Sequence, residues 1–171
     1  HPYAMTLSAG DDPEPGFVVA GHCIGCALQP IGRLLKARAD DSRVIWDRTF
    51  TDCDERYYSI ECYGVDATAD GGYIVTCGNG AEEPKPWIDC HQRTWTAFLY
   101  RADSAGKALW TANATDSAKK CLSDAGEHVV AARDGGVCRL CRFWHPRAAR
   151  HGRQLWPRCV WQWRVDSREC L

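Results

Sequence analysis

The chain has 171 residues, of which 45% are hydrophobic and 11% aromatic, with eight tryptophans. This composition excludes a disordered chain, and no apolar run reaches the roughly 18 residues of a membrane-spanning helix. The net charge is −1 but uneven, because residues 139–171 hold eight arginines against two acidic residues. These arginines are scattered among tryptophan, cysteine and leucine. We therefore expect them to attract the acidic body of the same or a neighbouring molecule rather than nucleic acid.

The first 54 residues read as four short strands. Residues 3–9 and 17–21 flank a turn rich in proline, aspartate and glycine at 11–16, and 34–40 and 43–50 follow. Aromatic and β-branched residues are typical of strands, and proline and glycine of turns. We expect one antiparallel unit over residues 1–54.

Residues 55–118 show the same pattern most clearly. Predicted strands at 57–68 and 73–77 surround the turn Asp70-Gly71-Gly72, where glycine accepts the positive φ of a tight hairpin. After a long polar loop, residues 96–103 and 107–112 form a second predicted hairpin. This gives a second unit of four strands.

Residues 119–171 form a third unit, which is basic and incomplete. Predicted strands at 127–133 and 137–143 flank Asp134-Gly135-Gly136, and another follows at 160–166, with no room for a fourth. The segment 117–126 looks helix-like but is too short for more than one or two turns. We expect an all-β protein of about three four-stranded antiparallel units, the last one strand short.

A near-repetition of letters supports these units. RADDSRVIW at 38–46 returns as RADSAGKALW at 101–110, and RVDS follows at 164–167, so that Arg38, Arg101 and Arg164 are evenly spaced. A fixed period of this kind indicates repeated structural units. We predict that these arginines, with Trp46 and Trp110, take part in packing between neighbouring units.

The strings ATADGGYIVTC and TAFLYRADSAGKALW resemble the blade repeat of secreted β-propellers, and ADSAGKALW is similar to the tryptophan docking motif of quinoprotein-type propellers. The resemblance implies four-stranded blades whose tryptophans wedge between neighbouring sheets. Closed propellers need about four to eight blades, more than this chain supplies. We therefore expect other copies of the chain to cover the remaining sheet surfaces, in a closed oligomer or a filament. The competing expectation is a compact sandwich with disulfides.

Eleven cysteines are a dense set for this length. Secreted proteins oxidise such sets to disulfides, whereas the two C-x-x-C pairs are too far apart to suggest zinc and lack the βαβ context of a redox motif. The disulfide candidates are Cys23, Cys26, Cys53, Cys62, Cys77, Cys90, Cys121, Cys138, Cys141, Cys159 and Cys170. Because their number is odd, at least one thiol is expected to be free or bonded to another chain. Asn113 begins a glycosylation sequon, and together these features predict a secreted glycoprotein.

Candidate sites for chemistry are sparse. Neither a G-x-S-x-G elbow nor a P-loop occurs, and we expect no catalysis and no cofactor. A histidine at the start of a chain can bind copper through its amine and ring, as in lytic polysaccharide monooxygenases, but Pro2-Tyr3-Ala4 shows nothing else of that family. His1, expected to be a processed end or the start of a fragment, is therefore a weak metal candidate. Its possible second donors are His22, His91, His128, His145 and His151.

The loop tryptophans offer an alternative function. Trp87, Trp95, Trp144 and Trp156 lie in or beside predicted loops, and exposed indoles can stack on sugar rings. A carbohydrate-binding module is therefore the alternative to our main prediction. That prediction is a secreted structural or interaction protein that assembles with copies of itself and has no membrane partner.

Overall fold

The structure, a computed structural model, describes residues 1–24, 30–50, 58–81, 96–113, 124–132 and 137–144. In these ranges the chain is all β, and they contain no helix. The strands are β1 (Pro2–Leu7), β2 (Gly16–Ile24), β3 (Pro30–Arg38), β4 (Val44–Phe50), β5 (Tyr58–Ala67), β6 (Tyr73–Ala81), β7 (Thr96–Ala102), β8 (Ala108–Asn113), β9 (Asp124–Ala131) and β10 (Val137–Trp144).

These strands form two four-stranded antiparallel sheets and one hairpin. Sheet A has the order β1-β2-β3-β4, sheet B has the order β5-β6-β7-β8, and β9 pairs with β10. Each strand pairs with the next along the chain, which is the arrangement that short hairpin connections allow. The all-β prediction and the four strands expected in each of the first two units are confirmed. The predicted strand at 160–166 lies outside the described residues, and β9 begins within the segment that looked helix-like.

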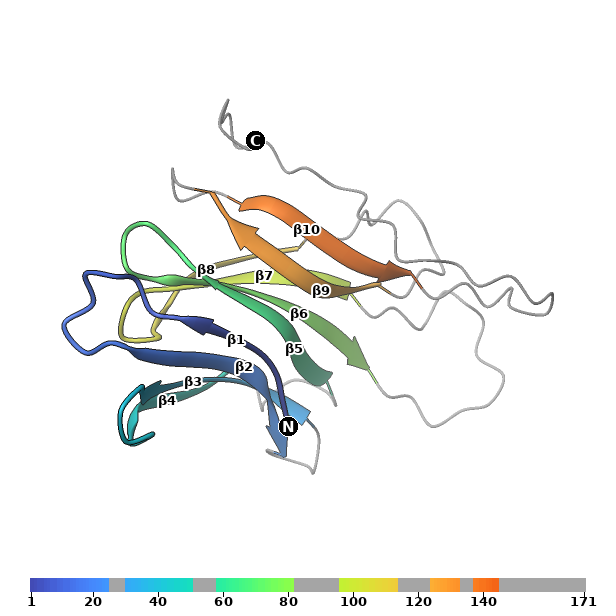
Figure 1. Cartoon of the computed structure of the whole chain (residues 1–171). Helices are drawn as coiled ribbons and strands as arrows, with labels where there is room; N and C mark the ends of the chain where they lie inside the picture. Colours follow the sequence, from blue (N-terminus) through green and yellow to red (C-terminus); the bar gives the residue numbers. More distant parts are fainter. Residues whose placement is uncertain (25–29, 51–57, 82–95, 114–123, 133–136, 145–171) are drawn as a thin grey trace, which may run out of the picture.

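Sheet B is the middle of three layers (Figure 1). On one face, Tyr73 and Val75 pack in a buried cluster with Leu34 of sheet A. On the other face, Ile74 and Leu99 pack with Val129 of β9. A strand that is buried on both faces reads as a continuous apolar run rather than an alternating one, which explains the sequence YIVTC in β6.

One carboxylate links all three layers. Asp66 of β5 accepts a hydrogen bond from the Thr6 hydroxyl of β1 at 3.4 Å and one from the Ala131 backbone N–H of β9 at 2.9 Å. A partly buried carboxylate with such partners fixes the lateral position of the layers, because sliding either neighbour would leave it unsatisfied.

A disulfide fastens the middle layer. Cys62 of β5 and Cys77 of β6 are directly opposite each other, are fully buried and are bonded. This confirms two of the eleven disulfide candidates. The bond closes a loop of 15 residues around the Asp70 turn.

Replacing both bonded cysteines, Cys62→Ala with Cys77→Ala, is expected to lower the free energy of unfolding by about 3 kcal/mol, the loop-closure value for a loop of about 15 residues. Urea unfolding followed by tryptophan fluorescence measures this loss. Cys23→Ala is the control, because half-buried Cys23 has no disulfide within the described residues. Equal losses in the two proteins would contradict the assignment.

Candidate functional site

Sheets A and B are built on the same register. In sheet A, Trp46 lies opposite Lys36, and the pairing then shifts before Ala37. In sheet B, Trp110 lies opposite Arg101, and the pairing shifts at the same place, before Ala102. The two tryptophans are therefore structurally equivalent, as the sequence predicted, and the position equivalent to Arg101 is held by Lys36.

Arg38 is thus not the counterpart of Arg101. It begins the β3–β4 turn, where its side chain is 36% exposed and pairs with Asp40 and Asp41. That turn is one residue longer than the turn between β7 and β8, since Arg38 bonds to Arg43 whereas Asp103 bonds to Lys107. The repeated letters Arg-x-Asp are therefore out of step with the repeated structure. Arg164 lies outside the described residues.

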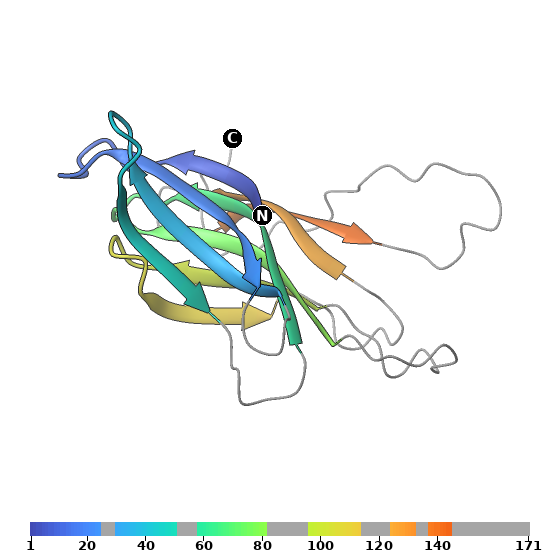
Figure 2. The same cartoon turned by 90° about the horizontal axis from the view of Figure 1, so that it is seen from below.

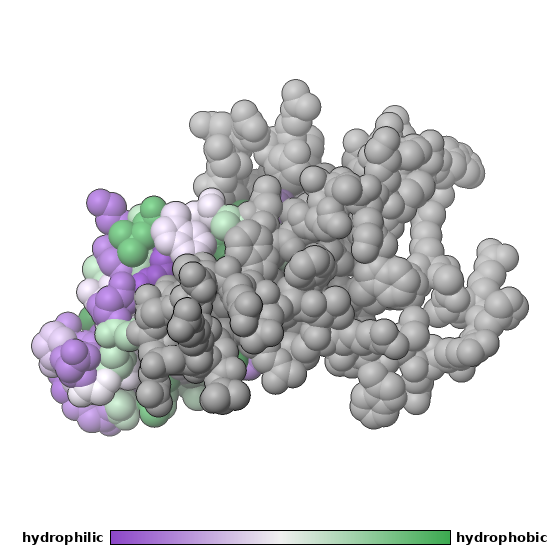
Figure 3. Space-filling model, turned by 90° about the horizontal axis from the view of Figure 1, so that it is seen from above, coloured by the Kyte–Doolittle hydropathy of each residue, from purple (hydrophilic) through white to green (hydrophobic). Residues whose placement is uncertain are grey.

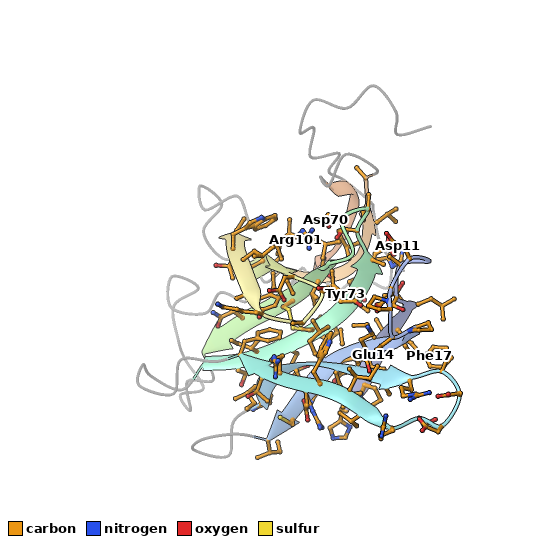
Figure 4. All side chains as sticks on the ribbon, turned by 90° about the vertical axis from the view of Figure 1, so that its left-hand side faces the viewer. Asp11, Glu14, Phe17, Asp70, Tyr73 and Arg101 are labelled. Atoms are coloured by element: carbon orange, nitrogen blue, oxygen red, sulfur yellow. A yellow bond between two sulfur atoms is a disulfide. The ribbon has the colours of Figure 1, made fainter. Side chains whose placement is uncertain are left out.

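Each sheet holds a buried cation against an aspartate from its first turn. The Lys36 ammonium lies 2.6 Å from the Asp12 carboxylate, and both side chains are at least nine-tenths buried. The Arg101 guanidinium donates to both oxygens of Asp70 at 2.5 and 2.7 Å and to the Tyr73 carbonyl at 3.1 Å (Figure 4). These pairs fasten the first turn of each sheet to its third strand.

The acidic members of these pairs are held ionised. Burial alone would raise the pKa of Asp12, but hydrogen bonds from Lys36 and from the Glu14 backbone outweigh it and lower the pKa below its usual value. The Thr68 hydroxyl, followed by the charge of Arg101, lowers the pKa of Asp70. Hydrogen bonding to the charged form is the common cause.

Sheet A contacts sheet B through aromatic side chains of its last strand. Trp46 packs edge-on against Tyr73 with 5.8 Å between ring centroids, and its indole N–H donates to the Ser104 carbonyl at 3.1 Å. Phe50 stacks on Tyr100 at 4.2 Å. Trp46 therefore lies between the two sheets, as expected of an inter-sheet wedge.

The turn that receives Trp46 depends on glycine. Gly106 has a φ of 75°, and a Cβ there would lie 2.8 Å from Cζ3 of Trp46. The Arg48 guanidinium donates to the Ala105 carbonyl of the same turn at 3.2 Å. One short turn of sheet B thus accepts an indole and a guanidinium from sheet A.

The outer face of sheet A corresponds to the covered face of sheet B. By register, Phe17, Val19 and Leu35 take the places of Tyr73, Val75 and Tyr100, and Met5 and Leu7 take those of Val65 and Ala67. We call these five residues of sheet A, with Ala37, the outer face. They lie on the side of sheet A turned away from sheet B, which Figure 2 shows from below.

This outer face is apolar and open to solvent. Met5 and Leu7 are each 62% exposed, and Phe17, Val19, Leu35 and Ala37 are only half-buried. The equivalent apolar residues of sheet B are buried or half-buried because sheet A covers them. Hydrophilic residues gather instead at the end of the molecule where the hairpin turns lie (Figure 3). Sheet A therefore carries an apolar surface of the kind that marks interaction sites.

A hollow of about 200 Å³ lies at one end of the outer face. In this hollow, Gly21 and Arg33 occupy the register positions that Cys77 and Phe98 occupy in sheet B. A Cβ on Gly21 would lie 2.1 Å from the His1 carbonyl oxygen, so glycine is required for the close approach of β1. The hollow is lined by His1, Pro2, Val19, Gly21, His22, Arg33 and Leu35.

Several predicted site residues lie where the sequence placed them. Asp70, Gly71 and Gly72 form the β5–β6 turn, in which Gly71 has a φ of 81° and its N–H bonds to the Thr68 carbonyl. Trp110, by contrast, was predicted to pack between neighbouring units but is 44% exposed on β8, an edge strand of sheet B. His1 lies beside His22, with 5.0 Å between ring centroids, and among the described residues no group of three or more metal-ligating side chains occurs.

Other predicted residues fall where no side chain is described. The Asp134-Gly135-Gly136 turn, the loop tryptophans Trp87, Trp95 and Trp156, and His91, His145 and His151 lie outside the described residues. Asn113 ends β8, Trp144 ends β10, and Cys138 and Cys141 are within β10, all described by their backbone only. The remaining cysteines outside the described residues are Cys26, Cys53, Cys90, Cys121, Cys159 and Cys170.

The sequence did not single out Lys36, Asp12 or the outer face. The spacing of the repeated letters connects neither Lys36 with Arg101 nor Asp12 with Asp70. The apolar residues in both alternating positions of FVVAG were the available signal, because they predict a strand with two apolar faces.

Comparisons with known proteins give no relative. No protein-family model matches the chain, and no curated protein is similar to it.

Among the residues that the structure describes, no helix has the length and apolar character needed to cross a bilayer.

Gly106→Ala is expected to destabilise the protein more than Gly71→Ala. Both glycines have positive φ, which costs an alanine about 1–2 kcal/mol, but the space around Gly71 is open whereas Gly106 touches Trp46. Urea unfolding gives the free energies of unfolding of the two variants for direct comparison. Similar costs in the two variants would contradict the role of the turn as an indole acceptor.

Lys36→Met is expected to cost about 3–5 kcal/mol at pH 7, because it leaves the Asp12 carboxylate buried without its cation. Adding Asp12→Asn should recover part of this loss. Arg33→Met is the control, since the Arg33–Asp47 pair is about 40% exposed and such pairs contribute about 0–1 kcal/mol.

The same ion pair predicts a pH dependence. The pKa of Asp12 is lowered in the folded state, so its stabilising effect is present above its unfolded pKa of about 3.9 and is lost as the pH falls through the folded value. Comparison of urea midpoints at pH 6 and pH 3 should show a smaller acid-induced loss in the Asp12→Asn, Lys36→Met protein than in the wild type. An identical loss in both would refute this contribution.

Proposed function

We propose that this chain is a structural or interaction protein that assembles with other copies of itself through the outer face of sheet A. The observation that carries the proposal is the correspondence of this face with the face of sheet B that sheet A covers. In this proposal sheets A and B act as successive propeller-like blades in an open stack.

The internal equivalence supports a second copy of the chain as the occupant of the outer face. Within one molecule, the matching surface of sheet B is filled by a four-stranded sheet that presents Trp46 and Phe50. A surface of the same register and apolar character suits cover by another apolar sheet surface, which in this proposal a second copy of the chain supplies. Burial of exposed apolar side chains supplies about 25 cal/mol per Å² toward association.

One difference from the internal contact affects how closely a partner fits. The place of Gly106 in the β3–β4 turn is taken by Ser42, which has a φ of 58° and a side chain. An incoming indole therefore cannot approach this turn as closely as Trp46 approaches Gly106. The partner's main contacts are accordingly with Phe17, Leu35 and Met5 at the centre of the face.

The proposal places this assembly outside the cell. Support comes from the buried Cys62–Cys77 disulfide, since such bonds persist in oxidising compartments and are rare in the cytosol. The sequon at Asn113 adds to this support.

We expect self-association to be reduced by Met5→Lys, which puts a charge at the centre of the proposed contact, and by Leu7→Lys, which puts one at its edge. Both side chains are 62% exposed in the single chain, so folding should be unaffected. Sedimentation velocity at micromolar concentration measures the size of each protein against the single-chain mass of 19.1 kDa.

Gly10→Lys is the matched control, since it adds the same charge at an exposed turn with open space around it. It should associate as the wild type does. A wild-type protein that stays at the single-chain mass, or a Gly10→Lys variant that dissociates equally, would overturn the proposal.

A further inference from the structure

The first and second strands bring two histidines together. His1 precedes β1 and lies opposite His22 of β2: the amino-terminal ammonium of His1 donates to the His22 carbonyl at 2.8 Å, and the His22 backbone N–H donates to the His1 carbonyl at 3.0 Å. Directly opposed residues of an antiparallel pair project their side chains to the same side of the sheet. The two imidazole rings accordingly lie close, with 5.0 Å between centroids and 41° between planes.

This spacing suits two ligands of one metal ion. An imidazole nitrogen binds zinc at about 2.0–2.1 Å, which puts each ring centroid about 3.2 Å from the metal. Two such rings at coordination angles of about 90–109° have centroids roughly 4.5–5.2 Å apart. The observed separation of 5.0 Å is within that range.

The second, independent observation is an unsatisfied nitrogen on His22. This residue is 7% exposed, and its Nδ1 is buried without a hydrogen-bond partner among the described residues. A buried polar atom without a partner is costly, and a bound ion is one of the recognised ways to satisfy it. Imidazole binds metals through a neutral nitrogen of this kind.

The surroundings hold the His22 ring and leave space beside it. The Tyr3 ring lies 5.4 Å from the His22 ring, and the Tyr3 hydroxyl donates to Glu61 at 3.4 Å. Both histidines line the hollow of about 200 Å³. Two cationic groups belong to its lining residues: the Arg33 guanidinium, which Asp47 balances through hydrogen bonds at 2.9 and 2.5 Å, and the amino-terminal ammonium of His1, which donates to the His22 carbonyl.

We infer that His1 and His22 form a two-histidine site for a divalent transition-metal ion, with water in the remaining coordination positions. Imidazole suits zinc, copper and nickel and is a poor partner for magnesium or calcium. Neither histidine belongs to the outer face as defined above, although Val19 and Leu35 of that face line the same hollow.

The test is calorimetric titration of Cu²⁺, Ni²⁺ and Zn²⁺ into the full chain, prepared without a histidine tag and with exposed thiols alkylated. One ion per chain should bind, and Mg²⁺ should not. His1→Ala and His22→Ala should each weaken the affinity by roughly tenfold or more, while His128→Ala, which removes an exposed histidine of β9, should leave it unchanged. The paramagnetic-resonance spectrum of bound Cu²⁺ should show nitrogen coupling that changes in both single variants.

Two further outcomes decide the inference. The His1 side chain is exposed, so His1→Ala carries the test even if His22→Ala fails to fold. Unchanged binding in His1→Ala, or an equal loss in His128→Ala, would overturn the site. Addition of one residue before His1 should leave binding intact, because the backbone nitrogen of His1 is already bonded to the His22 carbonyl. Loss of binding in that longer chain would contradict the inference, because it would show that the two imidazole rings alone do not hold the metal ion.

Discussion

The face-to-face packing of sheet A on sheet B is the contact on which the rest of the structure depends. Leu34 and Val18 enter the same buried cluster as Tyr73 and Val75, and the aromatic contacts of Trp46 and Phe50 cover the side of that cluster. A four-stranded sheet with two apolar faces is not stable alone in water, because it must bury both faces against other elements. Within the described part of the chain, sheet B meets this requirement on both sides and sheet A on one side only.

The polar groups make this packing specific. The Lys36–Asp12 pair is desolvated inside the molecule, where burial of charge is costly unless the partner is present. The equivalent pair of sheet B uses Arg101, whose planar group also satisfies two backbone carbonyls, of Tyr73 and Ala102. The same device is thus built from different letters in the two sheets. In both sheets the pair fastens the first turn to the third strand.

From the sequence, the positions of the strands are predicted better than which residues of the two units occupy equivalent positions. Strand positions follow from apolar runs bounded by turns, and the tryptophans align correctly because each lies in the fourth strand of its unit. The arginines misalign by two residues, since Lys36 holds the register position of Arg101 whereas Arg38 begins the turn between β3 and β4 at the position of Asp103. A match of residue types cannot reveal such a shift, because what the two sheets share at this position is a buried positive charge and not the same amino acid. The closeness of His1 and His22 is likewise a product of strand register, which a spacing of 21 residues does not encode.

The two faces of sheet A explain why its strands have their particular composition. Val18 and Ala20 project toward sheet B, while Phe17 and Val19 project away from it, so that β2 is apolar on both sides. A sheet with one solvated face ordinarily alternates apolar and polar residues, as antiparallel sheets with one wet side do. In β2 that alternation is absent. The apolar surface on its far side continues through Met5, Leu7 and Leu35 on the neighbouring strands, and such a composition suits a sheet that is buried on both sides. Among the residues that the structure describes, only the face toward sheet B is covered, and the proposed assembly would bury the other.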